Sequence, residues 1–465
     1  MLQKQENKMG ILPVPRLVLS MSIPIMISML IQALYNIVDS MFVARVSEEA
    51  LTAVSLAFPI QNLVIAVAIG TSIGINSLLS RSLGAKNIET AEKAANNGIV
   101  LGLLSWIVFA ILGLTLSKNF FALFTDNPTL LKMGTQYISV CLVFSLGIFI
   151  DITCERILQA TGDTIHPMII QSIGAISNII LDPIMIFGLF GFPALGIFGA
   201  AIATVISQHI SALLAIYYVR RNTEVQIQAR FFKLEKKIVL AIYAVGIPTI
   251  IMQAIGTLMV TSLNKIIIGY GISAVAVFGI YFKVQSFIFM PVFGLNSGMI
   301  PVIGFNYGAK QPKRIMEALK VGISISVSIM AIGMFIFLAF PHVLLSWFNA
   351  SPEMLAIGIV ALPRISLCFL SAGICIVLGA LFQATGDGYI SMIISITRQM
   401  VFLLPSAYFL GKFFGLDAIW FSFIIAESSS FFLSLFFFKQ EYTKKLKPLY
   451  VKKDPVLVET EETRS

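Results

Sequence analysis

The pentapeptide QATGD occurs at Gln159–Asp163 and again at Gln383–Asp387, 224 residues further along the chain of 465 residues. The same offset superimposes Gly84–Lys86 on Gly308–Lys310. Repeats are sought before any other pattern because they decide the architecture, and solenoid repeats have periods of only about 20–50 residues. A period this long predicts two whole, similar bundles and not a stack of small units.

The composition places these bundles in a lipid bilayer. Apolar residues make up 57% of the chain and charged residues 12%, whereas roughly a quarter of the residues of soluble domains are charged. Apolar stretches of about 20 residues recur, long enough to cross roughly 30 Å of hydrocarbon as helices and too long for the strands of a β-barrel. We predict an all-α integral membrane protein with about twelve spans, at 17–43, 52–80, 95–117, 130–158, 167–189, 196–219, 239–268, 275–303, 317–340, 354–382, 390–411 and 417–438.

An even number of spans in each repeat gives both copies the same direction through the membrane. Parallel repeats of this kind are a transporter architecture, with the substrate site between the halves. We therefore expect two pseudo-symmetric six-helix bundles around a V-shaped central cleft. The amino-terminal lobe is predicted at 1–219, a cytoplasmic linker at 220–237, the carboxyl-terminal lobe at 238–438 and a polar cytoplasmic tail at 439–465.

The basic residues indicate the orientation. Cytoplasmic loops hold an excess of Lys and Arg, and most of the 32 basic residues fall on the side of the amino terminus. Both termini are therefore expected on the cytoplasmic side of the cell membrane. The net charge of +9 belongs to these membrane flanks, which favours contact with membrane lipid over nucleic acid. The three His residues are dispersed and no phosphate-binding loop is present, so neither an enzyme nor an ATP-driven pump is indicated.

Acidic side chains inside predicted spans are the sharpest functional signals, because an ionised Asp at a helix centre costs about 2.5–3.5 kcal/mol. Asn178 and Asp182 lie four residues apart and share a helix face. Pro183 cannot donate to the carbonyl group of Ile179, which leaves an acceptor beside them. These oxygens suit a hard cation, or a carboxyl group that takes up a proton. The alternative is that both side chains only bond the backbone and a neighbouring helix.

Asp151 and Glu155 form a second acidic pair with the same spacing, on the fourth predicted span. One interpretation is that they attract a cationic substrate into the central cavity. The other is an ion pair inside the lobe with Arg156, which follows directly.

The second repeat carries charges of both signs at membrane depth, at Lys283, Arg398 and Glu427. Intramembrane charges usually pair with one another, and the alternative here is a role in substrate binding or conformational coupling. The candidates for substrate binding over the whole chain are Asp151, Glu155, Lys283 and Glu427.

These motifs resemble those of the multidrug and toxic compound extrusion (MATE) family over nearly the whole chain. The resemblance is carried by Leu83–Lys86, Gln159–Asp163, Asn178–Gly188 and the second-repeat copies, while Ile424–Ser428 resembles the MepA-type bacterial branch. It implies a multidrug efflux antiporter that exports amphipathic cationic drugs and dyes by alternating access in exchange for H⁺ or Na⁺, and so confers antibiotic resistance. It also implies no cofactor besides the coupling ion and no obligatory protein partner, so a monomer is expected.

The resemblance also assigns residues. The family's amino-terminal cation site corresponds to Asp39, Asn178 and Asp182, where Na⁺ would bind if it is the coupling ion. Tyr137 and Thr204 match polar positions of the family on the fourth and sixth spans.

Two other classes of function remain open. A lipid-linked oligosaccharide flippase of the same superfamily would need a strongly cationic cavity, for which Lys283, Arg364 and Arg398 are few. A membrane scaffold or receptor without transport would leave its buried acids costly and unused.

Overall fold

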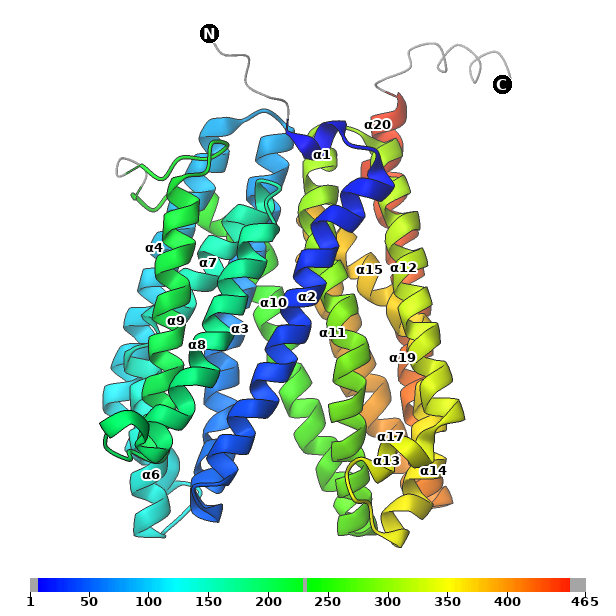
Figure 1. Ribbon diagram of the computed structural model, residues 1–465. Coiled ribbons are helices and arrows are strands. Elements are labelled where there is room, and N and C mark those ends of the chain that lie inside the picture. Colours follow the sequence, from blue (N-terminus) through cyan, green and yellow to red (C-terminus); the bar gives the residue numbers. More distant parts are fainter. Residues whose placement is uncertain (1–6, 229–231, 452–465) are drawn as a thin grey trace. The chain divides into compact units, whose positions relative to one another are not determined.

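The computed structural model describes residues 7–228 and 232–451, and these residues form helices joined by short connections, without β-strands (Figure 1). In lipid every backbone polar group must find its partner inside the protein, and a helix does so within its own segment. The long helices are α2 (Val14–Ala44), α3 (Glu48–Gly84), α4 (Ile88–Thr115), α8 (Ile165–Phe187), α9 (Ile197–Arg220), α10 (Lys236–Ile267), α11 (Ile272–Gly308), α12 (Pro312–Ala339) and α19 (Ser422–Glu441).

Shorter helices complete the described chain. Three of them form one continuous span at Gly388–Phe414, which contains a π-helical turn in its middle. The shorter elements are α1 (Lys8–Ile11), α5 (Ser117–Ala122), α13 (Pro341–Ser346), α16 (Gly388–Ile396), η4 (Thr397–Leu403), α17 (Leu404–Phe414), α18 (Leu416–Ile419), η5 (Tyr442–Leu446) and α20 (Lys447–Val451).

The described residues contain ten helical runs that are long and apolar enough to cross a membrane, or up to twelve if each of two bent pairs counts as one span. The predicted all-α membrane fold with about twelve spans is confirmed. The bent pairs are α6 (Pro128–Val143) with α7 (Leu146–Ala160), at 43°, and α14 (Pro352–Ser366) with α15 (Phe369–Thr385), at 47°.

Serine hydroxyl groups accompany both bends, which lie in the fourth predicted span of each repeat. Ser145 donates to the carbonyl oxygen of Leu142 at 2.8 Å, and Ser366 donates to that of Pro363 at 2.8 Å. A hydroxyl group that bonds the preceding turn competes with the helical backbone and favours a bend. Each bend thus divides a single span into two helices.

The helix ends flanking 220–237 lie close to those predicted, whereas the end of the last span differs. α9 ends at Arg220 and α10 begins at Lys236, so the described residues between them lie outside long helices. The last span was predicted to end at 438, whereas helix continues to Val451. Glu441 and Lys445 pair at 3.2 Å across one turn of that extension, which supports helix in a polar stretch. Residues 452–465 lie outside the described residues.

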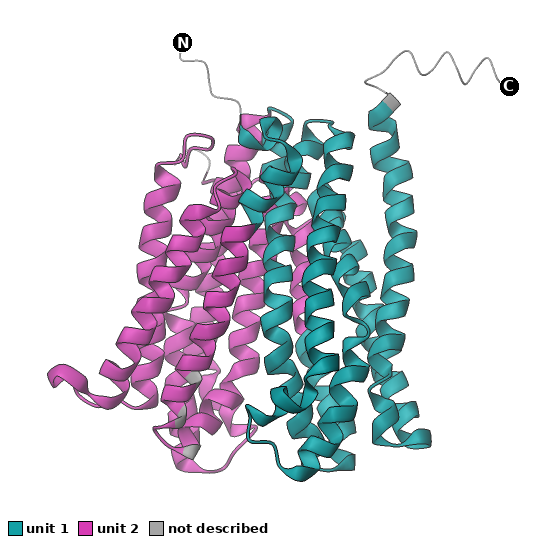
Figure 2. Cartoon of the chain, turned by 45° about the vertical axis from the view of Figure 1, so that its right-hand side comes forward, with its two compact units in different colours: residues 1–22, 80–86, 255–465 teal, residues 23–79, 87–254 magenta. Residues whose placement is uncertain are grey.

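The chain divides into two compact units (Figure 2). Unit 1 comprises residues 1–22, 80–86 and 255–465, and unit 2 comprises residues 23–79 and 87–254. The division passes through α2, α3 and α10 and does not follow the boundary between the sequence repeats. The lobes at 1–219 and 238–438, and the cleft between them, stay predictions.

Close glycine contacts explain why each unit draws helices from both repeats. In unit 2, a Cβ atom on Gly74 of α3 would lie 2.1 Å from the carbonyl oxygen of Ile242 on α10. In unit 1, a Cβ atom on Gly298 of α11 would lie 2.8 Å from the Cα atom of Ser22 on α2. Glycine at these positions permits backbones to approach closely in a membrane.

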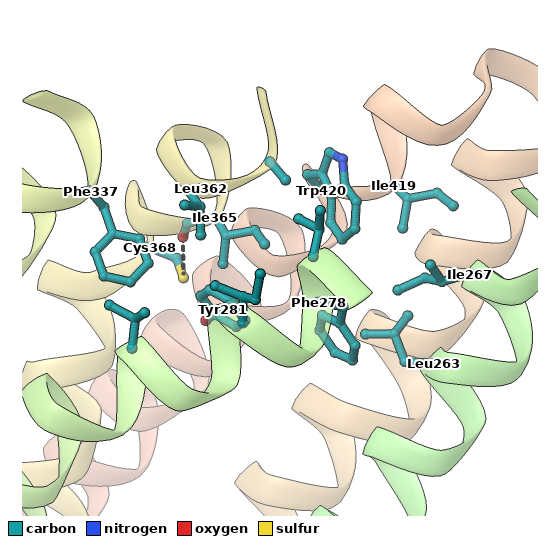
Figure 3. Packing of buried hydrophobic residues seen from close by; sticks show 14 of the residues in the cluster. Leu263, Ile267, Phe278, Tyr281, Phe337, Leu362, Ile365, Cys368, Ile419 and Trp420 are labelled. Atoms are coloured by element: carbon teal, nitrogen blue, oxygen red, sulfur yellow. Dashed lines mark hydrogen bonds between the residues drawn. The ribbon is translucent and has the colours of Figure 1, made fainter. Parts of the chain in front are cut away.

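Each unit has its own apolar core. In unit 1, Phe278, Tyr281, Phe337 and Trp420 belong to one buried cluster, which is drawn from α10 to α15 and from η4, α17, α18 and α19 (Figure 3). In unit 2, a second buried cluster contains Tyr137. These clusters fix the helices from which the polar side chains described next project.

Candidate functional sites

Asn178 and Asp182 lie one turn apart on α8, within unit 2. Nδ2 of Asn178 donates to Oδ1 of Asp182 at 3.3 Å, and the two residues are 2% and 0% exposed. Pro183 continues the helix without breaking it. Oδ1 of Asn178 and Oδ2 of Asp182 are buried and accept no hydrogen bond from the described residues. Two acceptors of this kind are costly unless a ligand or a proton satisfies them.

Thr204 and Tyr35 border this pair from two other helices of unit 2. Nδ2 of Asn178 lies 3.5 Å from Oγ1 of Thr204, which projects from α9. The hydroxyl group of Tyr35, on α2, interacts with the side chain of Thr204. The structure therefore brings Thr204 to the predicted pair and adds Tyr35, which sequence reasoning missed. Its spacing of four residues before Asp39 is the signal that could have found it.

Asp39 supplies the second carboxyl group. It is half-buried on α2, and its charge interacts with Asp182 and with Tyr35. Two carboxylates in one low-dielectric site repel each other, so they favour a shared proton or a bound cation. The three residues Asp39, Asn178 and Asp182 thus lie together, although they come from helices far apart in the sequence.

Tyr137 and Gln61 extend this group. Tyr137 on α6 is 4% exposed, and Nε2 of Gln61 on α3 lies 3.1 Å from its hydroxyl oxygen. The same amide nitrogen lies 3.8 Å from Sγ of Cys141, and the hydroxyl group of Tyr137 interacts electrostatically with Asp39. Sequence reasoning missed Gln61. The corresponding residue of the second repeat is also a glutamine, Gln285, so comparison of the two repeats does not mark Gln61 as different.

We name this group the unit-2 polar cluster; it comprises Tyr35, Asp39, Gln61, Tyr137, Asn178, Asp182 and Thr204. Carboxylate, amide and hydroxyl oxygens are the ligands that hard cations prefer. In residues 7–228 and 232–451 no group of three or more His, Cys, Asp and Glu side chains could hold a metal ion, and the cluster has only two carboxylates. Its chemistry fits one monovalent cation or one proton.

Asp151 and Glu155 lie on α7 in unit 2. Both are half-buried, they interact electrostatically with each other, and Oδ1 of Asp151 and Oε1 of Glu155 accept no hydrogen bond from the described residues. Arg156 donates instead to Oε1 of Gln159 at 2.9 Å. No ion pair in the described part of the chain joins Glu155 to Arg156, although the two side chains interact electrostatically.

Arg398 and Glu427 form an ion pair in unit 1. Nη1 of Arg398, in the π-helical turn η4, lies 3.2 Å from Oε2 of Glu427 on α19. The expected pairing of opposite charges is thus confirmed for these two residues. Lys283 is exposed and lies apart from them, with Nζ 5.8 Å from the ring centroid of Phe348.

Comparison with known proteins gives consistent results over nearly the full chain. The MatE family model matches residues 24–184 and 248–409, one segment in each repeat. The multidrug export protein MepA of Staphylococcus haemolyticus is 28% identical over 419 residues, covering 89% of this chain and 91% of that protein.

Two further relatives differ in what they are named for. The FAD transporter of Shewanella oneidensis is 29% identical over 407 residues, covering 85% of this chain and 88% of that protein. A crystal structure of a MATE protein in complex with MaL6 superimposes with a TM-score of 0.89 at 26% identity, covering 96% of this chain and 100% of that chain. The arrangement of helices is therefore that of the MATE fold.

Proposed function

The chain belongs to the MatE family, as a multi-pass membrane transporter of the multidrug type, and from this premise we propose that it exports amphipathic organic cations in exchange for H⁺ or Na⁺. In this proposal Asp39, Asn178 and Asp182 bind the coupling ion. Tyr137 and Thr204 complete the polar surroundings of the two carboxyl groups. The protein acts in the cytoplasmic membrane, with both termini in the cytoplasm.

One observation carries the proposal: two carboxyl groups interact at membrane depth in unit 2, beside acceptor oxygens that have no partner among the described residues. A site of this kind loses one unit of negative charge, and with it much of the repulsion between its two carboxylates, when it holds a proton or a sodium ion. Ion binding thereby changes the electrostatic free energy of unit 2, and it shifts the transporter towards the state that binds the ion more tightly. Substrate release on the outside follows if that state binds the cationic substrate less tightly.

The substrate class rests on Asp151 and Glu155. Their unpartnered carboxyl oxygens lie at membrane depth, where a bound organic cation would stabilise the ionised form of the pair. The relatives are named for different cargoes, multidrug export in MepA and FAD in the Shewanella protein, so the site and not the family decides the cargo.

Transport by the purified protein in liposomes tests this proposal. Ethidium movement is recorded under an imposed proton gradient and, separately, under a sodium gradient, for the wild type, Asp182→Asn and Asp126→Asn. Asp126 is an exposed acid between α5 and α6, so its variant controls for the loss of one negative charge. We expect transport under one of the gradients, lost in Asp182→Asn and kept in Asp126→Asn. Equal transport in the wild type and Asp182→Asn would overturn the proposed coupling site.

A further inference from the structure

The ion pair of unit 1 is incompletely satisfied. Arg398 makes one hydrogen bond from Nη1 to Glu427, although a guanidinium group has five N–H donors. Oε1 of Glu427 is buried and has no partner among the described residues. A buried ion pair stabilises a protein only when further hydrogen bonds satisfy the remaining atoms. A purely structural role therefore explains this pair poorly.

The position of Arg398 indicates what its spare donors face. It lies in the middle of the span Gly388–Phe414, and its side chain is 33% exposed, whereas that of Glu427 is 8% exposed. A charged side chain at the centre of a membrane faces the bundle interior or a water-filled cavity and not the lipid. The part of the guanidinium group that Glu427 does not bond is therefore expected to face the interior of the bundle.

The backbone at Arg398 is specialised as well. Thr397–Leu403 forms a π-helical turn between α16 and α17, and π-turns are rare and frequently mark functional sites. Gln399, the next residue, is 5% exposed and donates to the hydroxyl group of Ser395 at 2.7 Å. The turn therefore buries one polar side chain and leaves its neighbour partly exposed.

We propose that Arg398, oriented by Glu427, is a subsite for the carboxylate of zwitterionic amphiphiles. A guanidinium group matches a carboxylate with two parallel hydrogen bonds, which a single bond to Glu427 leaves available. The inference rests on the proposed transport function and names a second class of substrate. In this proposal the acidic residues of unit 2 bind the cationic group of a substrate, whereas Arg398 binds the carboxylate of substrates that also carry a negative charge.

Equilibrium binding of two matched dyes tests the subsite. Rhodamine B has a free carboxylate, and its ethyl ester has the same fluorophore without that charge. Fluorescence anisotropy is measured with the full-length protein and with the double variant Arg398→Gln/Glu427→Gln, in which no unpaired charge remains to impair folding. Lys412→Gln is the control, because Lys412 is an exposed cation near the carboxyl end of the same span.

We expect the double variant to bind rhodamine B about tenfold more weakly, as for the loss of one charge-assisted interaction, and the ester within about twofold of the wild type. Arg398→Lys keeps the positive charge but lacks the paired N–H groups of a guanidinium, so its affinity for rhodamine B should lie between those of the wild type and the double variant. Lys412→Gln should bind rhodamine B as tightly as the wild type does. An equal loss for both dyes, an unchanged affinity for rhodamine B, or no binding of rhodamine B to the wild type would overturn the subsite. Failure of the wild type to transport the ester would instead contradict the proposed function.

Discussion

At the scale of single residues, some members of the unit-2 polar cluster carry charge and others orient the charged side chains. Asp39 and Asp182 carry the charge, while Asn178 donates to Asp182 and approaches Thr204. Each donor that already points at a carboxylate stabilises its ionised form, and each unpartnered acceptor destabilises it until an ion arrives.

Gln61 is expected to tune this balance through Tyr137. Replacing Gln61 with Leu removes the donor at 3.1 Å from the Tyr137 hydroxyl oxygen and leaves that hydroxyl free to turn away from Asp39. Loss of a neutral buried hydrogen bond costs about 1 kcal/mol, which corresponds to about a fivefold weaker affinity for the coupling ion. The measurement is the ion concentration that half-displaces bound ethidium.

The repeat supplies the control for this variant. Gln285→Leu makes the same change at the corresponding position of the second repeat, in unit 1. Its affinity for the ion should stay at the wild-type value. Equal shifts in both variants would show that Gln61 acts through general stability and not through Tyr137.

The sequence predicted part of this cluster for physical reasons. Asn178 and Asp182 could be paired because their spacing places them on one helix face, and the structure shows the hydrogen bond between them. Gln61 could not be recognised in the same way, because no acidic residue lies three or four positions from it, and Tyr35 could be recognised only from its spacing to Asp39. Asp39 was assigned by resemblance, since no local pattern joins α2 to α8.

At the scale of elements, the bends and the π-helical turn were the features that sequence did not reveal. The break between α6 and α7 contains neither proline nor glycine, and Ser145 bends the chain through a bond to its own preceding turn. The π-turn at Arg398 likewise has no signature in residue type. Span number and position followed from apolar length, whereas changes of direction within a span depend on packing.

Glycine packing between α3 and α10 gives a stability prediction. Gly74→Ala places a methyl group 2.1 Å from the carbonyl oxygen of Ile242, so the two backbones must separate. We expect a lower melting temperature in detergent, with a cost of about 1–3 kcal/mol, the range for overpacking a close contact.

A second glycine in a long helix serves as the matched control. A Cβ atom on Gly279, in α11, would meet nothing within 4 Å. Gly279→Ala should therefore leave stability unchanged or raise it by up to about 1 kcal/mol, because alanine favours the helix. If Gly74→Ala were as stable as Gly279→Ala, the close contact would not contribute to folding.

At the scale of the whole molecule, the two repeats have diverged in chemistry while keeping their spans. The position that corresponds to Asp39 is Leu263, which is 0% exposed in the apolar core of unit 1. The position that corresponds to Asp182 is Ser406, whose hydroxyl group donates to the carbonyl oxygen of Leu403 at 3.1 Å. At these two positions unit 1 thus has an apolar side chain and a side chain bonded to the backbone, where unit 2 has carboxyl groups. We infer that one unit binds the ion and the other contributes to substrate recognition.

The orientation predicted from the basic residues is testable with single cysteines. Cys141, Cys154, Cys368 and Cys375 are replaced by alanine, and one cysteine is introduced by either Asp126→Cys or Arg221→Cys, both at exposed positions. A membrane-impermeant maleimide should label the first variant in intact cells and the second only after permeabilisation. The reverse pattern would place the termini outside.

In the proposed mechanism Asp39 and Asp182 link ion binding to substrate binding, and an affinity that depends on both ligands measures such linkage. Ethidium binding to the purified protein is titrated at several proton and sodium concentrations, for the wild type and for Asp39→Asn/Asp182→Asn. Because linkage is reciprocal, the wild-type affinity for ethidium should fall as the concentration of the coupling ion rises. The double variant should bind ethidium with an affinity independent of both ions. A double variant that kept the ion dependence of the wild type would contradict the account.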